Sequence, residues 1–168
     1  AKGIVKREVI RVITAGTFLD DADTPRAILA LFIGKDKNAL AFTDTTAGAI
    51  YLNEYANINL LAETVAKLPV YECVFDLSQE ESIRSFFNLP VLKNKTITYS
   101  PAQDWTFNQE IAEKKLCEHF SVKTLRGFGV DDMPKAISVA GALLEYLQTI
   151  NRQPLRHIYK LAVFSQDE

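Results

Sequence analysis

The sequence predicts an α/β fold built on a mixed sheet, in which some strands are antiparallel and others parallel. Three apolar, strand-like runs follow one another closely and are joined by connections of only a few residues. After them, helix-like and strand-like segments alternate. Short connections make neighbouring strands antiparallel, whereas helical crossovers place helices on the faces of a sheet. An apolar content of 48% and a charged content of 24% are ordinary for a globular protein.

The first part of the chain predicts an arm followed by a three-stranded meander. The arm contains "IVKREVIRVIT", where apolar and charged residues alternate as in an extended segment. The predicted strands are Ala27–Ile33, 39–44 and 47–54, linked by "GKDKN" and "TT". Links this short are typical of hairpins, so the three strands are expected to run antiparallel.

Helix-strand units are predicted next. A helix over 58–68 ends before Pro69, strands are expected at 70–75 and 95–100, and residues 78–89 form a second helix. Ser78 and Glu81 have the spacing of a capping box at the start of that helix. The layout is that of ribonuclease H-like domains, a mixed sheet flanked by helices.

The next segment is predicted to be extended and then helical. In "DWTFN", Trp105 and Phe107 are expected on the same side of an extended stretch. The helix over 108–120 is amphipathic. Its predicted buried face consists of Ile111, Ala112, Leu116 and Phe120.

A long helix is predicted from Pro134, after a turn containing Gly127 and Gly129. Asp131 and Asp132 precede it, and carboxylates there favour the helix dipole but repel phosphate, so the glycines are not interpreted as a phosphate loop. The helix is apolar on almost every side, which predicts neighbours on two sides. We expect part of its face from Ile137 to Ile150 to be exposed or to pack against another copy of the chain.

Small residues within this helix indicate a close contact. Gly141 stands between Ala140 and Ala142, so another helix is expected to approach closely there.

Charge and cysteine content narrow the classes of function. A net charge of −2 and a pI near 5.8 argue against a chain that binds nucleic acid by itself. Cys73 and Cys117 form neither a disulfide framework nor a metal-binding pair, which favours reduced thiols in a cytoplasmic protein. The longest apolar run, Ala27–Ile33, is too short to span a bilayer, so no membrane association is expected.

Four segments, in the same order along the chain, together resemble the bacterial MutS family of DNA mismatch repair proteins. They are "KREVIRVITAGT", "AFTDTTAG", "DWTFNQEIAEKKLCEHF" and "LRGFGVDDMPKAISVAGALLEYLQTINRQPLRHI". The chain departs from the family pattern at Ala15, where proline is usual, and in its first loops, which are shorter.

The resemblance implies a division of the chain into three parts. Residues 1–22 would be an arm from the mismatch-reading domain, 23–128 the connector domain, and 129–168 the start of the helical core domain. The residues assigned to the connector-core junction are Gly127, Gly129, Pro134, Gly141, Leu144 and Leu147.

The resemblance also implies a non-catalytic role for this stretch. The family's Phe-x-Glu element and Walker A loop do not occur in it, so it has no expected cofactor, although ATP and Mg²⁺ would serve the whole protein. The connector would couple mismatch reading to the ATPase domains and would provide a docking surface for MutL. Lys114 and Lys115 are the residues nominated for that surface. The other implied partners are the remaining domains, a second subunit and, through other domains, mismatched DNA.

Two other functions remain open from the sequence. A ribonuclease H-like layout could support a metal-dependent nuclease using Asp44, Asp76 and Glu110, although the first strand carries no acid. Alternatively, the basic residues Lys2, Lys6, Arg7 and Arg11 could make the arm a weak DNA-binding module.

Overall fold

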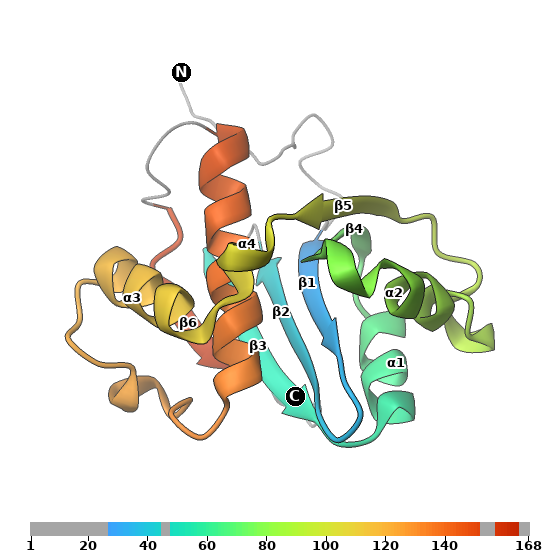
Figure 1. Ribbon diagram of the computed structural model, residues 1–168, viewed down its shortest axis with the longest axis horizontal. Helices are drawn as coiled ribbons and strands as arrows, with labels where there is room; N and C mark the ends of the chain where they lie inside the picture. The colour runs from blue at the N-terminus through green and yellow to red at the C-terminus, as the bar shows by residue number, and fades with distance from the viewer. Residues whose placement is uncertain (1–26, 45–47, 152–156, 165–168) are drawn as a thin grey trace.

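The computed structural model describes residues 27–44, 48–151 and 157–164. Its centre is one six-stranded sheet with the strand order β5-β4-β1-β2-β3-β6. Helices α3 and α4 cover one face of the sheet, and α1 and α2 cover part of the other (Figure 1). The predicted fold class, a mixed sheet flanked by helices, is confirmed.

The strands form an antiparallel half and a parallel half. The antiparallel meander consists of β1 (Ala27–Ile33), β2 (Asn38–Asp44) and β3 (Ala49–Tyr55). On the other side of β1, β4 (Val70–Asp76) and β5 (Thr98–Ala102) run parallel to it. The last strand, β6 (Lys160–Val163), pairs in parallel with β3 and was not predicted.

Four helices accompany the sheet: α1 (Ile58–Ala66), α2 (Glu80–Phe87), α3 (Gln109–Phe120) and α4 (Pro134–Asn151). The side chains of Asn57 and Asn108 accept hydrogen bonds from backbone N–H groups at the starts of α1 and α3. These asparagines satisfy donors that a helix cannot pair internally.

Two local predictions about helix starts and extended segments were wrong. Ser78 does not cap α2; Asp76 instead accepts hydrogen bonds from the Ser78 N–H and hydroxyl, both at 3.0 Å, and holds a 3₁₀ turn over Leu77–Gln79. The Asp76 carboxylate, two residues earlier, therefore takes the Ser78 N–H that the predicted capping box needed. Residues Asp104–Phe107 likewise form a 3₁₀ turn rather than an extended segment.

The two faces of the sheet build two separate apolar cores. Alternation along β1 sends Ile28 and Ala30 toward α3 and α4, and Leu29 and Leu31 toward α1 and α2. Of the predicted buried residues of α3, Ala112 and Leu116 are buried, whereas Ile111 is 42% exposed. Helix α4 packs across β1, β2 and β3, so it completes the first core.

The position of α4 bears on two predictions. Its apolar residues Ile137, Leu143, Leu144 and Leu147 are at most 2% exposed, and only its last turn presents an exposed apolar side chain, Ile150. The expected two neighbours are present, because the sheet contacts one side of α4 and α3 contacts another. The expectation of an uncovered face was therefore wrong.

The second prediction concerns the domain boundary. Because α4 lies in the core and β6 extends the sheet, the described residues after 129 belong to the same folded unit as those before it. The division at residue 129 therefore does not separate two packed units among the described residues. Residues 1–22, the predicted arm, lie outside the described residues.

Gly141 lies where α3 crosses α4. A Cβ atom added there would come within 2.6 Å of the Cα atom of Ala112. Contacts this short do not occur between real side-chain and backbone carbons, so one helix would have to move. The close approach expected at Gly141 is thus present, and its neighbour is α3.

Replacing Gly141 with alanine tests this crossing. Alanine is the better helix former by about 1 kcal/mol, but overpacking against backbone costs about 1–3 kcal/mol. Because the added Cβ atom would meet backbone, we take the upper end of the overpacking cost and subtract the gain in helix propensity. We therefore expect Gly141→Ala to lower the free energy of unfolding, measured in urea, by about 2 kcal/mol. Gly127→Ala is the matched control, because an added Cβ at Gly127 would meet nothing within 4 Å. Equal stability of the two variants would contradict the crossing.

Candidate interaction surface

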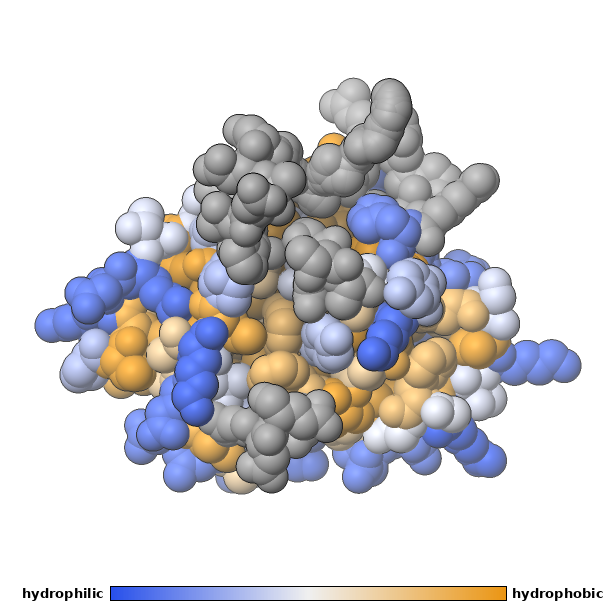
Figure 2. Space-filling view, turned by 180° about the vertical axis from the view of Figure 1, so that it is seen from behind, coloured by the Kyte–Doolittle hydropathy of each residue, from blue (hydrophilic) through white to orange (hydrophobic). Residues whose placement is uncertain are grey.

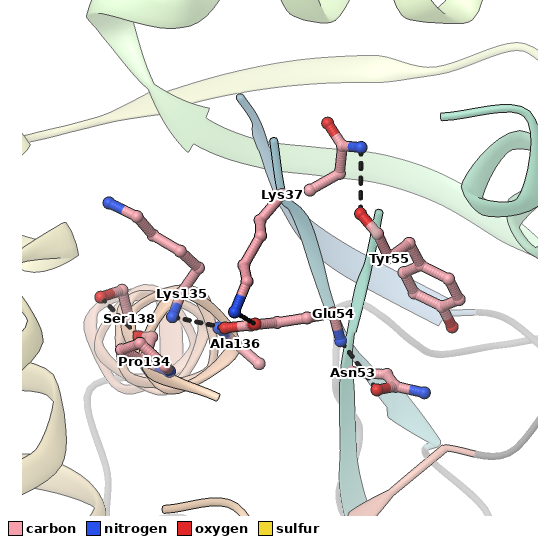
Figure 3. A network of polar contacts seen from close by, with 9 residues as sticks. Lys37, Asn53, Glu54, Tyr55, Pro134, Lys135, Ala136 and Ser138 are labelled. Carbon is pink, nitrogen blue, oxygen red and sulfur yellow. Dashed lines mark hydrogen bonds and ion pairs between the residues drawn. The ribbon is translucent and has the colours of Figure 1, made fainter. Parts of the chain in front are cut away.

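The N-terminus of α4 is capped from the sheet. One carboxylate oxygen of Glu54, near the end of β3, accepts hydrogen bonds from the backbone N–H groups of Lys135 at 2.7 Å and Ala136 at 3.2 Å (Figure 3). The other oxygen of Glu54 lies 3.4 Å from the Lys37 ammonium. A carboxylate at this end satisfies unpaired donors and favours the helix dipole.

This geometry changes the interpretation of the segment before α4. Asp131 and Asp132, which the sequence analysis related to the helix dipole, are both exposed, and the carboxylate that caps the helix is Glu54. The conclusion that the segment does not cradle phosphate is unaffected, since a carboxylate already occupies the helix N-terminus. Gly129 has a φ of 73° and ends a 3₁₀ turn, so glycine suits that position.

A second polar cluster holds α4 near its other end. The Glu72 carboxylate on β4 accepts hydrogen bonds from the hydroxyls of Tyr146 on α4 and Ser100 on β5, the latter at 2.6 Å. Burial, followed by the hydrogen bond to Glu72, raises the pKa of Tyr146 from 10.0 to about 12. The cluster joins α4 to the outer parallel strands.

Four of the exposed residues of α3 form a stripe along the helix. Its members are Glu110, Ile111, Lys114 and Glu118, and we call them the α3 stripe. Of the two lysines nominated from the family resemblance, Lys114 belongs to this stripe. Lys115 lies at its border with α4, where its ammonium is 2.7 Å from the Glu145 carboxylate. The two neighbouring lysines therefore have different environments.

The nominated junction residues fall into two groups. Gly127 and Gly129 are exposed in the turn before α4, and Pro134 is the first residue of that helix. Gly141, Leu144 and Leu147 are buried within the core that α4 shares with the sheet and α3. The structure brings the second group together and keeps it apart from the α3 stripe.

The carboxylates considered for a nuclease have the following positions. Asp76 holds the turn after β4, Glu110 lies on the outer side of α3, and Asp44 ends β2. Within residues 27–44, 48–151 and 157–164, no group of three or more histidine, cysteine or acidic side chains could hold a metal ion. The basic residues proposed for DNA binding, Lys2, Lys6, Arg7 and Arg11, lie outside this part of the chain.

The side of the molecule opposite Figure 1 has a different character. Apolar residues are visible across the middle of its described surface, and hydrophilic residues project around the rim (Figure 2). Over the whole described surface, without regard to the side of the molecule, the exposed large apolar residues include Ile58 and Leu60 of α1, together with Leu77 and Val91. A surface of this composition suits contact with protein better than contact with phosphates. No helix in the described residues is long and apolar enough to cross a membrane.

Glu54 and Glu72 hold α4 in place, and the sequence did not single out either of them for that role. Glu54 and its partner Lys135 are 81 residues apart, and Glu72 and Tyr146 are 74 apart. No local motif joins residues so distant. The signal available in the sequence was the charge itself, because Glu54 and Glu72 lie within strands that are mostly apolar.

Removing the Glu54 carboxylate tests the cap of α4. Glu54→Ala leaves two helix donors without their acceptor, so we expect the free energy of unfolding to fall by about 1–3 kcal/mol. Lys37→Ala removes only an ion pair whose lysine side chain is 55% exposed, and should cost less than about 1 kcal/mol. Urea denaturation of both variants gives the comparison. A smaller loss for Glu54→Ala than for Lys37→Ala would refute the capping role.

The Tyr146 cluster predicts a loss of stability in alkali. Between pH 10 and about pH 12 the unfolded chain releases this phenol proton before the folded chain does, so stability falls as pH rises. Tyr146→Phe should make this part of the pH profile shallower, as measured by urea unfolding. Tyr159→Phe, at a residue 73% exposed, is the control and should leave the profile unchanged. Identical profiles for all three proteins would contradict the cluster.

Comparisons with known proteins agree with this architecture. Residues 26–159 match the family model described as MutS domain II, which includes the whole of α4. The chain is 30% identical, over all of its length, to the DNA mismatch repair protein MutS of Desulfatibacillum aliphaticivorans. It is 31% identical over 98% of its length to MutS of Salinibacter ruber, and 34% identical over 91% to MutS of Thermodesulfovibrio yellowstonii.

These relatives are much longer than the chain. The matched region covers 19%, 18% and 17% of their respective lengths. The family-model match covers more than half of the chain, and the 30% identity to the first of these relatives extends over the whole chain. The chain therefore belongs to the MutS family and contains its domain II.

Proposed function

We propose that this domain is a non-catalytic connector that couples mismatch recognition to the ATPase domains of a MutS protein and provides a docking surface for MutL. The observation that carries the proposal is the α3 stripe on a helix whose inner side is locked to α4. A helix held in this way presents its outer side chains in a fixed arrangement. Such preorganisation lowers the entropic cost of binding a partner.

The α3 stripe has the composition of a protein contact. It combines an apolar residue, Ile111, with charges of both signs on Glu110, Lys114 and Glu118. Mixed charges around an apolar contact favour a partner with the complementary pattern. In this proposal, Lys114 makes a charge contact with MutL and Ile111 makes an apolar one.

The coupling role is supported by the three elements that hold α4. Glu54 of β3 contacts its first turn, Glu72 of β4 contacts Tyr146, and α3 crosses it at Gly141. A force applied to α3 therefore reaches the sheet through α4 without passing through a loop. In the proposed role, the domain transmits such a force as a nearly rigid body.

The remaining partners belong to the whole protein. We propose that ATP and Mg²⁺, mismatched DNA and a second subunit bind through other domains, and that the protein acts in the cytoplasm. The domain itself uses no cofactor in this account. Its contribution is mechanical, through the positions of α3 and α4.

Charge reversal at Lys114 tests the docking surface. Lys114→Glu should weaken binding of the 168-residue chain to the cognate MutL by on the order of 3- to 10-fold, because one charge contact becomes repulsive. Lys67→Glu at the end of α1, where the lysine is also exposed, is the matched control and should bind normally. Biolayer interferometry with immobilised chain measures both affinities.

A second variant tests whether MutL recognises the shape of the α3 stripe rather than its charge. Ile111→Arg places a bulky charge at the centre of the α3 stripe and should weaken binding at least as much as Lys114→Glu. If both variants bind MutL as tightly as the unchanged chain, α3 is not the docking surface.

A further inference from the structure

Lys115 is already engaged by a carboxylate of its own chain. Its ammonium lies 2.7 Å from one oxygen of Glu145, and the hydroxyl of Thr149 lies 3.4 Å from the other oxygen. The side chains of Lys115 and Glu145 are 25% and 28% exposed. Both are therefore within reach of a molecule that settles on α3.

The two helices hold this ion pair in register. One turn before Lys115, Ala112 contacts Gly141 so closely that no side chain fits between the helices. One turn after Gly141, Glu145 projects toward Lys115. Because the crossing fixes the helix backbones, the ion pair can exchange partners only by rotation of its side chains.

An ion pair in this position can be exchanged for another. Partly exposed ion pairs contribute little net stability, since water solvates both charges well. A carboxylate from outside that approached Lys115 would replace Glu145 at little cost, provided that other contacts held it there. Lys114, the preceding residue, offers a second positive charge for the same incoming group.

We propose that Glu145 is an internal competitor for the docking site, and that a carboxylate-bearing segment of the docking partner displaces it from Lys115. The proposal rests on the proposed function, because it assumes that the partner binds α3. Displacement frees the Glu145 side chain on α4. Docking at α3 would thereby change the contacts of α4 as well as its own.

The competition predicts that removing Glu145 strengthens docking. Glu145→Gln should tighten binding of cognate MutL by about two- to fivefold, the range expected for a partly exposed ion pair. Lys115→Gln should weaken binding by a similar factor. In a Lys115→Gln background, Glu145→Gln should have no further effect on the affinity for MutL, because the ammonium for which the two carboxylates compete is absent.

The control variant is Glu63→Gln on α1, which removes the same charge from an exposed position on the opposite side of the sheet. It should bind like the unchanged chain, and circular dichroism should show that all variants remain folded. Unchanged or weaker binding by Glu145→Gln, while the unchanged chain binds MutL, would overturn the competition and leave the docking role intact. Absence of MutL binding by the unchanged chain would instead refute the proposed function, and the competition with it.

Discussion

Helix α4 can be apolar on nearly every side only because the sheet and α3 contact it together. Its residues from Ala136 to Leu147 complete the core on one face of the sheet. Two acidic side chains of the sheet fix it further, because Glu54 caps its start and Glu72 binds Tyr146. Without α4, the apolar side chains of β1, β2 and β3 on this face would lack their cover.

This constraint links the proposed docking surface to the rest of the domain. The outer side of α3 is exposed, while its inner side is held against α4 at Ala112. In the proposed role, a partner on α3 acts on α4 directly, and α4 acts on the strands through Glu54 and Glu72. Coupling of this kind requires packed elements with defined contacts and needs no catalytic group.

The sequence predicted those parts of the fold that local patterns determine. The strands β1 to β4 and the helices were found because alternation, helical periodicity and short connections depend on neighbouring residues. The capping box at Ser78 failed because Asp76, only two residues earlier, competes for the same donor. A local sequence motif therefore fails when a neighbouring side chain accepts the hydrogen bond that the motif needs.

The place of α4 could not be predicted in the same way. An apolar helix indicates that partners exist, but the pattern does not say whether they precede or follow it. Here they precede it, in strands whose contacts with α4 span more than seventy residues. The candidate site shows the same division: the resemblance to the MutS family pointed to Lys114 and Lys115, whereas only the folded structure separates the exposed lysine from the one paired with Glu145.

Hydrogen exchange of the backbone amides in the 168-residue chain tests most directly whether α4 is integral to the domain. If it is, the amides of Ile137 to Leu147 exchange only through global unfolding, as slowly as those of β1 and β2. The contrary result would be rapid exchange throughout α4 while the sheet stays protected. That outcome would make α4 a separate, loosely attached helix and would remove the physical basis of the proposed coupling.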